Sequence, residues 1–339
     1  MTISDPDQKG ESPNPTKIGT NRPGMGFSFQ LCRRSCLLGA IVVGLIFYVQ
    51  LSQFRQSRNS ETPKAWDDPI DRRRSSYNKC ENWKYLIEPV KLCHIGKLAK
   101  EKLFESFHQA TGECSAHLKR RLKMELLNNL DDQKGFVNFV SNATTRTDCI
   151  GITLGIGNDT LAENKLLERV PNCRLYGADP QDKVGQVFNK IGTYDNVAVG
   201  HKNGVINASV LVGSIFEYKF KEVQALSFLD FLQKHNLVHK VIDFLFLDAE
   251  GAEFELLPYM SHGGPLDKAG VTICQVNMEL HCGLEKYGSS HDQYDLYMSR
   301  FIMDSAYVPV WAMKGCHNRY FFINYESPLC LERFFRSTC

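Results

Sequence analysis

Three carboxylates follow an apolar run in the stretch FLFLDAEGAEFELL, residues 244–257. Asp248 and Glu250 come directly after the run, and Glu253 stands about one turn into a predicted helix. Carboxylates at the end of a buried strand can take a proton from a hydroxyl as a general base, hold a divalent cation, or cap the helix that follows. For Glu253 we expect a structural role, in which its charge complements the dipole of that helix.

A second set of residues has the spacing of a nucleoside-cofactor site. Gly155 and Gly157 follow another apolar run, and glycines in such a turn allow the backbone to approach a ligand closely. Asp179 ends the next run, 24 residues after Gly155. An acid about 20 residues after a glycine loop can accept hydrogen bonds from both ribose hydroxyls. Asp179 can also cap a helix that begins at Pro180, and the two roles are compatible.

A further run ends in Glu279 and His281. Ligands of open α/β sheets bind beyond the carboxyl ends of the strands. We therefore expect Asp248, Glu250 and His281 to meet on one rim and to be the catalytic side chains. The alternative for His281 is a strand-end histidine whose hydrogen bonds are satisfied within the fold.

The elements that must position these residues indicate an α/β fold. Apolar runs separated by helix-length segments predict a mainly parallel sheet with helices on both faces. The last two runs have no helix between them and predict an antiparallel edge. The predicted strands are residues 149–157, 173–180, 196–200, 241–251, 271–281, 307–313 and 319–325. Residues 81–140 are expected to form a helical segment before a domain at 141–339, because apolar residues recur there at helical spacing.

The N-terminal part has a different composition. Residues 1–35 predict a disordered tail, 36–52 a transmembrane anchor without a charged residue, and 53–80 a polar stem. Arg33 and Arg34 directly before the anchor favour a cytoplasmic N-terminus, hence type II topology in the endoplasmic reticulum or Golgi. Ten of the 12 cysteines follow the anchor, which permits lumenal disulfides, with buried free thiols as the alternative. The net charge of +2 gives no general attraction to nucleic acid.

The series TLGIGNDT, YGADP, NVAVG, LSFLDFL, IDFLFLDAEGAEFELL and ICQVNMELH, in this order, resembles the FkbM-type methyltransferase family, and in particular its membrane-anchored, nematode-type branch. The resemblance covers about residues 135–325 and implies a Rossmann-like class I methyltransferase fold that uses S-adenosylmethionine. It implies that Gly155 and Gly157 lie under the methionine part of the cofactor and that Asp179 binds the ribose. Asp248 and Glu250 would lie near the transferred methyl group. Thr153 departs from the family, whose first motif has an acid at that position that seats the amino end of the cofactor.

These observations predict an S-adenosylmethionine-dependent O-methyltransferase that acts on a hydroxyl of a sugar or glycan. A divalent metal is a further candidate cofactor. One alternative is a metal-dependent glycosyltransferase, since Asp248 and Glu250 mimic a D-x-D metal motif. The other is a non-catalytic binding protein that retains the fold, for which Thr153 is the evidence. The glycine loop with Asp179 argues against the glycosyltransferase.

Overall fold

The computed structural model describes residues 81–98, 102–212 and 217–335. The predicted tail, anchor and stem lie outside these residues. Among the residues described, no helix has both the length and the apolar character that crossing a membrane requires.

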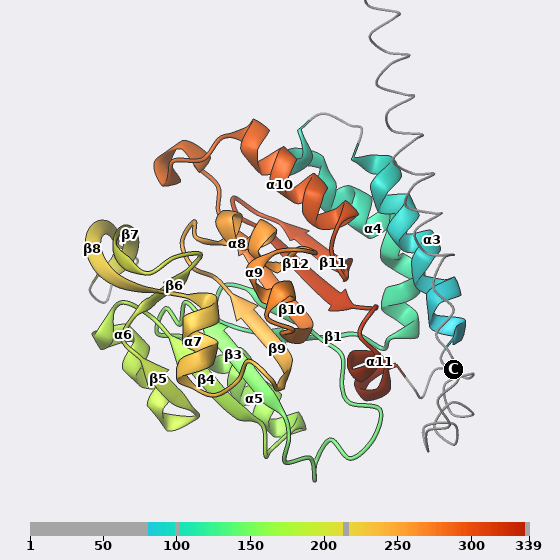
Figure 1. The fold of residues 1–339 in the computed structure, drawn as a ribbon, viewed down its shortest axis with the longest axis horizontal. Helices are drawn as coiled ribbons and strands as arrows, with labels where there is room; N and C mark the ends of the chain where they lie inside the picture. The colour runs from blue at the N-terminus through green and yellow to red at the C-terminus, as the bar shows by residue number, and fades with distance from the viewer. Residues whose placement is uncertain (1–80, 99–101, 213–216, 336–339) are drawn as a thin grey trace, which may run out of the picture. The chain divides into compact units, whose positions relative to one another are not determined.

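The central sheet has seven strands in the order β11-β12-β10-β9-β3-β4-β5 (Figure 1). The strands β10, β9, β3, β4 and β5 are parallel, and β12 and β11 add an antiparallel edge. This confirms the predicted mainly parallel sheet. The strands are β3 (Ile150–Leu154), β4 (Arg174–Ala178), β5 (Thr193–Asp195), β9 (Val241–Leu247), β10 (Thr272–Leu280), β11 (Tyr307–Lys314) and β12 (Asn318–Asn324).

Helices cover both faces of this sheet. They are α3 (Glu81–Lys97), α4 (Leu103–Arg121), α5 (Leu161–Arg169), α6 (Asp182–Gly185), α7 (Phe228–Lys234), α8 (Glu253–Met260), α9 (Pro265–Lys268), α10 (His291–Met303) and α11 (Pro328–Phe334), with short 3-10 turns η1 (Gln186–Lys190) and η2 (Leu284–Tyr287). Successive side chains of a strand point to opposite faces. Accordingly, Leu245 and Leu247 pack with α7, α8 and α10, whereas Phe244 and Phe246 pack with α5 and α11.

The strand order reverses beside β3, which pairs with β4 on one side and β9 on the other. Chains diverge at such a point and leave a crevice beyond the strand ends. The two loops nevertheless touch at their base, because Asp248 N donates to Leu154 O at 2.8 Å. The topology thus brings the glycine loop after β3 and the acidic loop after β9 to the same crevice.

The predicted helical segment at 81–140 is wrong in its second half. Helix α4 ends at Arg121, and Lys123 has a φ of 50°, a left-handed conformation that a helix cannot continue through. Strands β1 (Glu125–Asn128) and β2 (Gln133–Phe136) follow as an antiparallel hairpin. Leucines that fit a helical period therefore lie on a strand, where tertiary pairing overrides the local pattern.

A second, three-stranded sheet has the order β6-β8-β7. It consists of β6 (Ala198–Gly200), β7 (Gly204–Val212) and β8 (Glu217–Ser227). The run at 196–200, predicted as a strand of the main sheet, thus belongs to this second sheet. The polar strand β5 takes its place in the main sheet, and its three residues are too few to show a strand period.

Within the described part of the chain, eight cysteines form four disulfides. The pairs are Cys93–Cys114, Cys149–Cys173, Cys274–Cys330 and Cys282–Cys316. The alternative of free buried thiols is therefore wrong for these eight residues.

Candidate functional site

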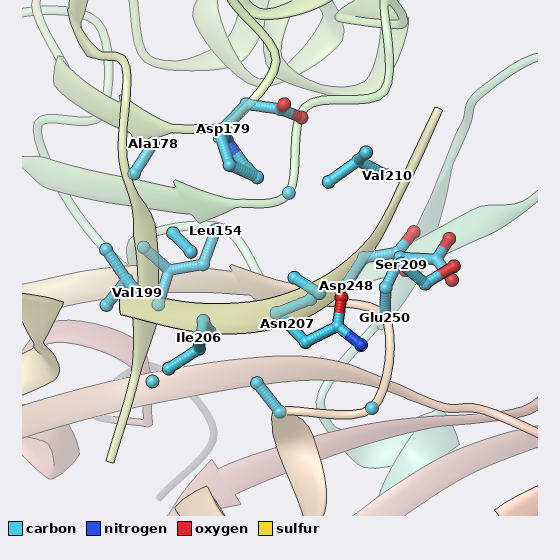
Figure 2. A pocket seen from close by; sticks show the side chains of 18 of the residues that line it. Leu154, Ala178, Asp179, Val199, Ile206, Asn207, Ser209, Val210, Asp248 and Glu250 are labelled. Carbon is cyan, nitrogen blue, oxygen red and sulfur yellow. The ribbon is translucent and has the colours of Figure 1, made fainter. Parts of the chain in front are cut away.

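Two cavities of about 640 and 510 Å³ lie beyond the carboxyl ends of the parallel strands. Both are lined by the loop after β3 and by Asp248 and Glu250. The larger cavity extends towards Asp179 and the second sheet, and the smaller one towards Thr153 and His281. Figure 2 shows Asp179 on one side of the larger cavity, and Asp248 and Glu250 on another. The predicted site residues therefore surround one connected region.

The two predicted loop glycines have different structural reasons. Gly155 has a φ of 84°, and an added Cβ would lie 1.6 Å from the Asp248 carbonyl oxygen. Only glycine therefore lets the loops after β3 and β9 touch. Gly157 has a φ of 59° and nothing within 4 Å of an added Cβ, so its backbone faces open space in both cavities.

Asp179 is buried and fixes the glycine loop. Its Oδ2 accepts from Ile156 N at 2.9 Å and from Gly157 N at 3.1 Å, and its Oδ1 accepts from Gln181 N at 2.8 Å. Burial raises the pKa of Asp179, although these hydrogen bonds oppose the change. The predicted cap of a helix beginning at Pro180 is wrong, because helix α6 begins at Asp182 and has Gln181 at its N-cap. Asp179 instead links the turn before this helix to the glycine loop. The ribose contact stays a prediction.

Glu253 organises the acidic loop instead of only complementing a helix dipole. It is fully buried and is the first residue of α8. Its Oε1 accepts from Ala249 N and its Oε2 from Gly251 N, both at 2.7 Å. Between them Glu250 has a φ of 50°, a conformation that costs energy in a residue other than glycine. Glu253 therefore holds the loop in a conformation that directs Asp248 and Glu250 at the cavities.

His281 lies among the three acids, as the sequence predicted for the rim. Its Nδ1 is 3.0 Å from Glu253 Oε1, and its Nε2 is 3.5 Å from both Asp248 Oδ1 and Glu250 Oε1. Burial alone would lower the pKa of His281, but the carboxylates of Glu253, Glu250 and Asp248 raise it well above its ordinary value. An imidazolium donates from both nitrogens. His281 therefore serves better to hold these carboxylates than to act as a base.

The sequence reasoning missed Lys134, Asp132 and Arg319. Lys134 and Asp132 form a buried ion pair at the hairpin β1–β2. Arg319 of β12 donates to both oxygens of Glu279, at 2.9 and 2.7 Å. The carboxylates of Asp248, Asp132 and Glu279 raise the pKa of Lys134 above its ordinary value, against the effect of burial. No spacing in the sequence signals these residues, because they reach the site from elements far apart along the chain.

Among the groups of side chains that could hold a metal ion, two include Asp248. One consists of Asp132, Asp248 and Glu279, and the other of Asp248, Glu253 and His281, each with ligand atoms within 4.8 Å of one another. In the first group, however, Lys134 and Arg319 already neutralise Asp132 and Glu279. In the second, Glu253 already accepts two backbone hydrogen bonds. An ion would have to displace these partners.

The comparisons with known proteins decide the family. The sequence profile of the methyltransferase FkbM domain matches residues 65–303. The chain belongs to the FkbM methyltransferase family. The match begins well before the region in which the motifs lie, so the family domain includes the helices α3 and α4. The narrower assignment to a membrane-anchored, nematode-type branch stays a prediction.

The other comparisons add little to this assignment. No curated protein matches the sequence. Among solved structures, the plantazolicin methyltransferase BpumL in complex with SAH is similar, with 12% identity and a TM-score of 0.22. The alignment covers 70% of this chain and 65% of that one. This similarity is too distant to support conclusions about the site.

Proposed function

We propose that the protein is an S-adenosylmethionine-dependent O-methyltransferase, with a sugar or glycan hydroxyl as acceptor. The observation that carries the proposal is the junction of the two cavities, where the glycine loop meets Asp248 and Glu250. The larger cavity can take the adenosine of the cofactor, while the smaller one has room for its methionine part and for an acceptor. Membership of the FkbM family supports methyl transfer in general.

The residues of the larger cavity suit the adenosine part of the cofactor. Backbone without side chains at Gly157 leaves room for a ligand, and Ala198, Val199 and Gly200 line the same cavity with small or apolar groups. Such surfaces bind a planar base, while a few polar groups set its orientation. Asp179 accepts hydrogen bonds from two N–H groups of the loop and would bind the ribose. When bound, the cofactor supplies the activated methyl group.

Asp248 and Glu250 are placed to receive the proton of the acceptor hydroxyl. A neutral hydroxyl is a weak nucleophile, and a carboxylate that takes its proton during attack lowers the barrier. Burial raises the pKa of Asp248, against the effect of Lys134 and His281, which makes it a stronger base than an exposed aspartate. The O–H proton would go to the carboxylate as the new O–CH₃ bond forms and the S–CH₃ bond breaks, with S-adenosylhomocysteine as the leaving group.

The acceptor side of the site has exposed aromatic residues. Tyr218 and Phe220 of β8 are about two-fifths exposed, at 43% and 40%. Tyr218 and Lys286 line both cavities, and the Lys286 Nζ lies 5.5 Å from the centre of the Phe220 ring. Apolar ring faces edged by polar groups suit a sugar, which has an apolar face and hydroxyl edges. These side chains support a glycan acceptor.

An oxidising compartment fits the four disulfides, since such bonds are rare where thiols are kept reduced. They support placement of the catalytic part in the lumen of the secretory pathway, behind a type II anchor at 36–52. The cofactor is made in the cytosol and would have to be imported. Protection of residues 81–335 from protease in sealed microsomes tests this placement; digestion would contradict it.

Methyl transfer from labelled S-adenosylmethionine to a panel of oligosaccharides tests the function, using the whole 339-residue chain. We expect Asp248→Asn and Glu250→Gln to lower kcat by about 10²–10⁴-fold, the range for a lost general base. Glu332→Gln is the control, because Glu332 is exposed on α11. Near-normal rates in both site variants would refute the base role.

The metal-dependent glycosyltransferase is kept as a second candidate by the carboxylate group Asp132, Asp248 and Glu279. A chelator distinguishes the methyltransferase from the metal-dependent glycosyltransferase. Because Lys134 and Arg319 already neutralise two of these acids, methyl transfer should continue in excess EDTA. Sugar transfer from a nucleotide sugar that depends on added manganese would favour the second candidate.

A further inference from the structure

Glu163 is a buried acid that the site described so far does not use. It lies on α5, is 2% exposed, and its Oε1 accepts from Thr153 Oγ1 at 2.8 Å. Its Oε2 has no hydrogen-bond partner among the described residues. A buried carboxylate oxygen without a partner is costly, and the structure therefore calls for an additional donor at this point.

Glu163 stands at the wall of a cavity, and its unpartnered oxygen is buried there. Glu163 and Thr153 line the smaller of the two cavities, beside Gly155 and Gly157 of the glycine loop. Helix α5 begins directly after that loop, at Leu161. Its first turn therefore brings the inward-facing Glu163 next to the last residues of β3.

A purely structural role explains Glu163 poorly. A glutamate in the first turn of a helix complements the dipole equally well from the surface, without the cost of burial. Glu163 instead points inward, and its single described side-chain partner is a neutral hydroxyl. A cation that enters from the cavity would both satisfy the oxygen and balance the charge.

We propose that Glu163 binds the α-ammonium group of the cofactor's methionine part, in place of the acid that the FkbM family carries at the position of Thr153. The carboxylate comes from the helix after the loop instead of the strand before it. Thr153 keeps this carboxylate in place through the hydrogen bond that its hydroxyl donates. This assignment rests on the proposed function, and it removes the main reason for regarding the protein as a non-catalytic relative.

The charges around Glu163 agree with this role. Burial raises the pKa of Glu163 to about 7. That pKa is lowered by the Thr153 hydroxyl, by the backbone N–H of Glu163 itself and by the charge of Lys134, whereas Asp159 raises it. An ammonium group that binds beside it would lower the pKa further, because an opposite charge favours the ionised form. Binding near pH 7 should therefore release protons from this carboxyl group.

Calorimetry on the whole chain tests the assignment with two probes. S-adenosylhomocysteine carries the amino-acid part, and 5′-methylthioadenosine lacks it. We expect Glu163→Gln to weaken the binding of S-adenosylhomocysteine roughly 10- to 100-fold, the effect of one hydrogen bond to a charged group. The affinity for 5′-methylthioadenosine should stay unchanged. Titration at pH 7 in two buffers of different ionisation enthalpy should show proton release for wild type and none for the variant.

Two further variants sharpen the result. Thr153→Asp in the Glu163→Gln background restores a carboxylate from the strand and should recover much of the lost affinity. Glu168→Gln is the matched control, because Glu168 is exposed on the same helix. This variant should change the affinity for neither probe. Equal affinity of Glu163→Gln and wild type for S-adenosylhomocysteine would overturn the assignment. An equal loss of affinity for both probes would overturn it as well. Failure of wild type to bind either probe would instead refute the proposed function.

Discussion

Glu253 is the residue on which the acidic loop depends. One carboxylate accepts from two backbone N–H groups and contacts His281, all within a fully buried site. Because both oxygens are used, no neutral side chain of the same shape can replace it. An amide presents only one acceptor, so one of the two N–H groups would face an NH₂ group.

We therefore expect Glu253→Gln to lower the free energy of unfolding by about 1–3 kcal/mol, the cost of a buried unsatisfied donor. The pKa of His281 should fall, because its nearest negative charge is removed. Urea denaturation and an NMR titration of His281 measure the two effects. Glu255→Gln on the same helix is the control for stability. An unchanged His281 pKa would contradict the cluster described above.

At the level of elements, the hairpin β1–β2 is attached to the main sheet by two buried amides. Asn277 accepts from Gly135 N at 2.5 Å and donates to Gly135 O at 2.9 Å. Gln275 makes the same two bonds with Val137, at 2.9 and 2.8 Å. These side chains replace the backbone of a neighbouring strand. They place Lys134, which directly precedes the first attachment point, at the site.

Asn277→Ala should leave both backbone groups of Gly135 unpaired and lower the free energy of unfolding by about 2–4 kcal/mol. The rate of methyl transfer should also fall, because Lys134 loses its fixed position. Gln133→Ala on the same hairpin should change stability by less than about 0.5 kcal/mol. Chemical denaturation and initial rates give both values. Loss of stability with full activity would show that Lys134 is not needed at the site.

The sequence predicted the parallel strands well because buried strands contain continuous apolar runs, such as residues 244–247. It also predicted that Asp248, Glu250 and His281 meet, since adjacent strand ends lie on one rim. It failed for Lys134 and Glu163. Their positions depend on the hairpin attachment and on the helix facing Thr153, and neither contact leaves a local pattern.

For the whole molecule, the four disulfides differ in their relation to the site. Cys282–Cys316 lies next to the site, because Cys282 follows His281 and its backbone N donates to His317 Nδ1 at 3.2 Å. The ring centroids of His281 and His317 are 4.5 Å apart. Cys93–Cys114 instead joins α3 to α4, away from both cavities.

Removing either disulfide should cost about 2–4 kcal/mol of stability, but only one removal should affect catalysis. We expect Cys282→Ser with Cys316→Ser to lower kcat as well as the melting temperature. The double variant at Cys93 and Cys114 should lower the melting temperature alone. Thermal unfolding and initial rates under the same buffer compare them. An equal loss of kcat in both would contradict the structural role assigned to the pair beside His281.

The most direct test of the account is a calorimetric titration of the whole chain with S-adenosylmethionine. The account predicts saturable binding of one molecule per chain, loss of that binding in Asp179→Ala, which releases the glycine loop, and no change in Asp182→Ala, an exposed neighbour. A folded wild-type protein that binds no S-adenosylmethionine would contradict the account.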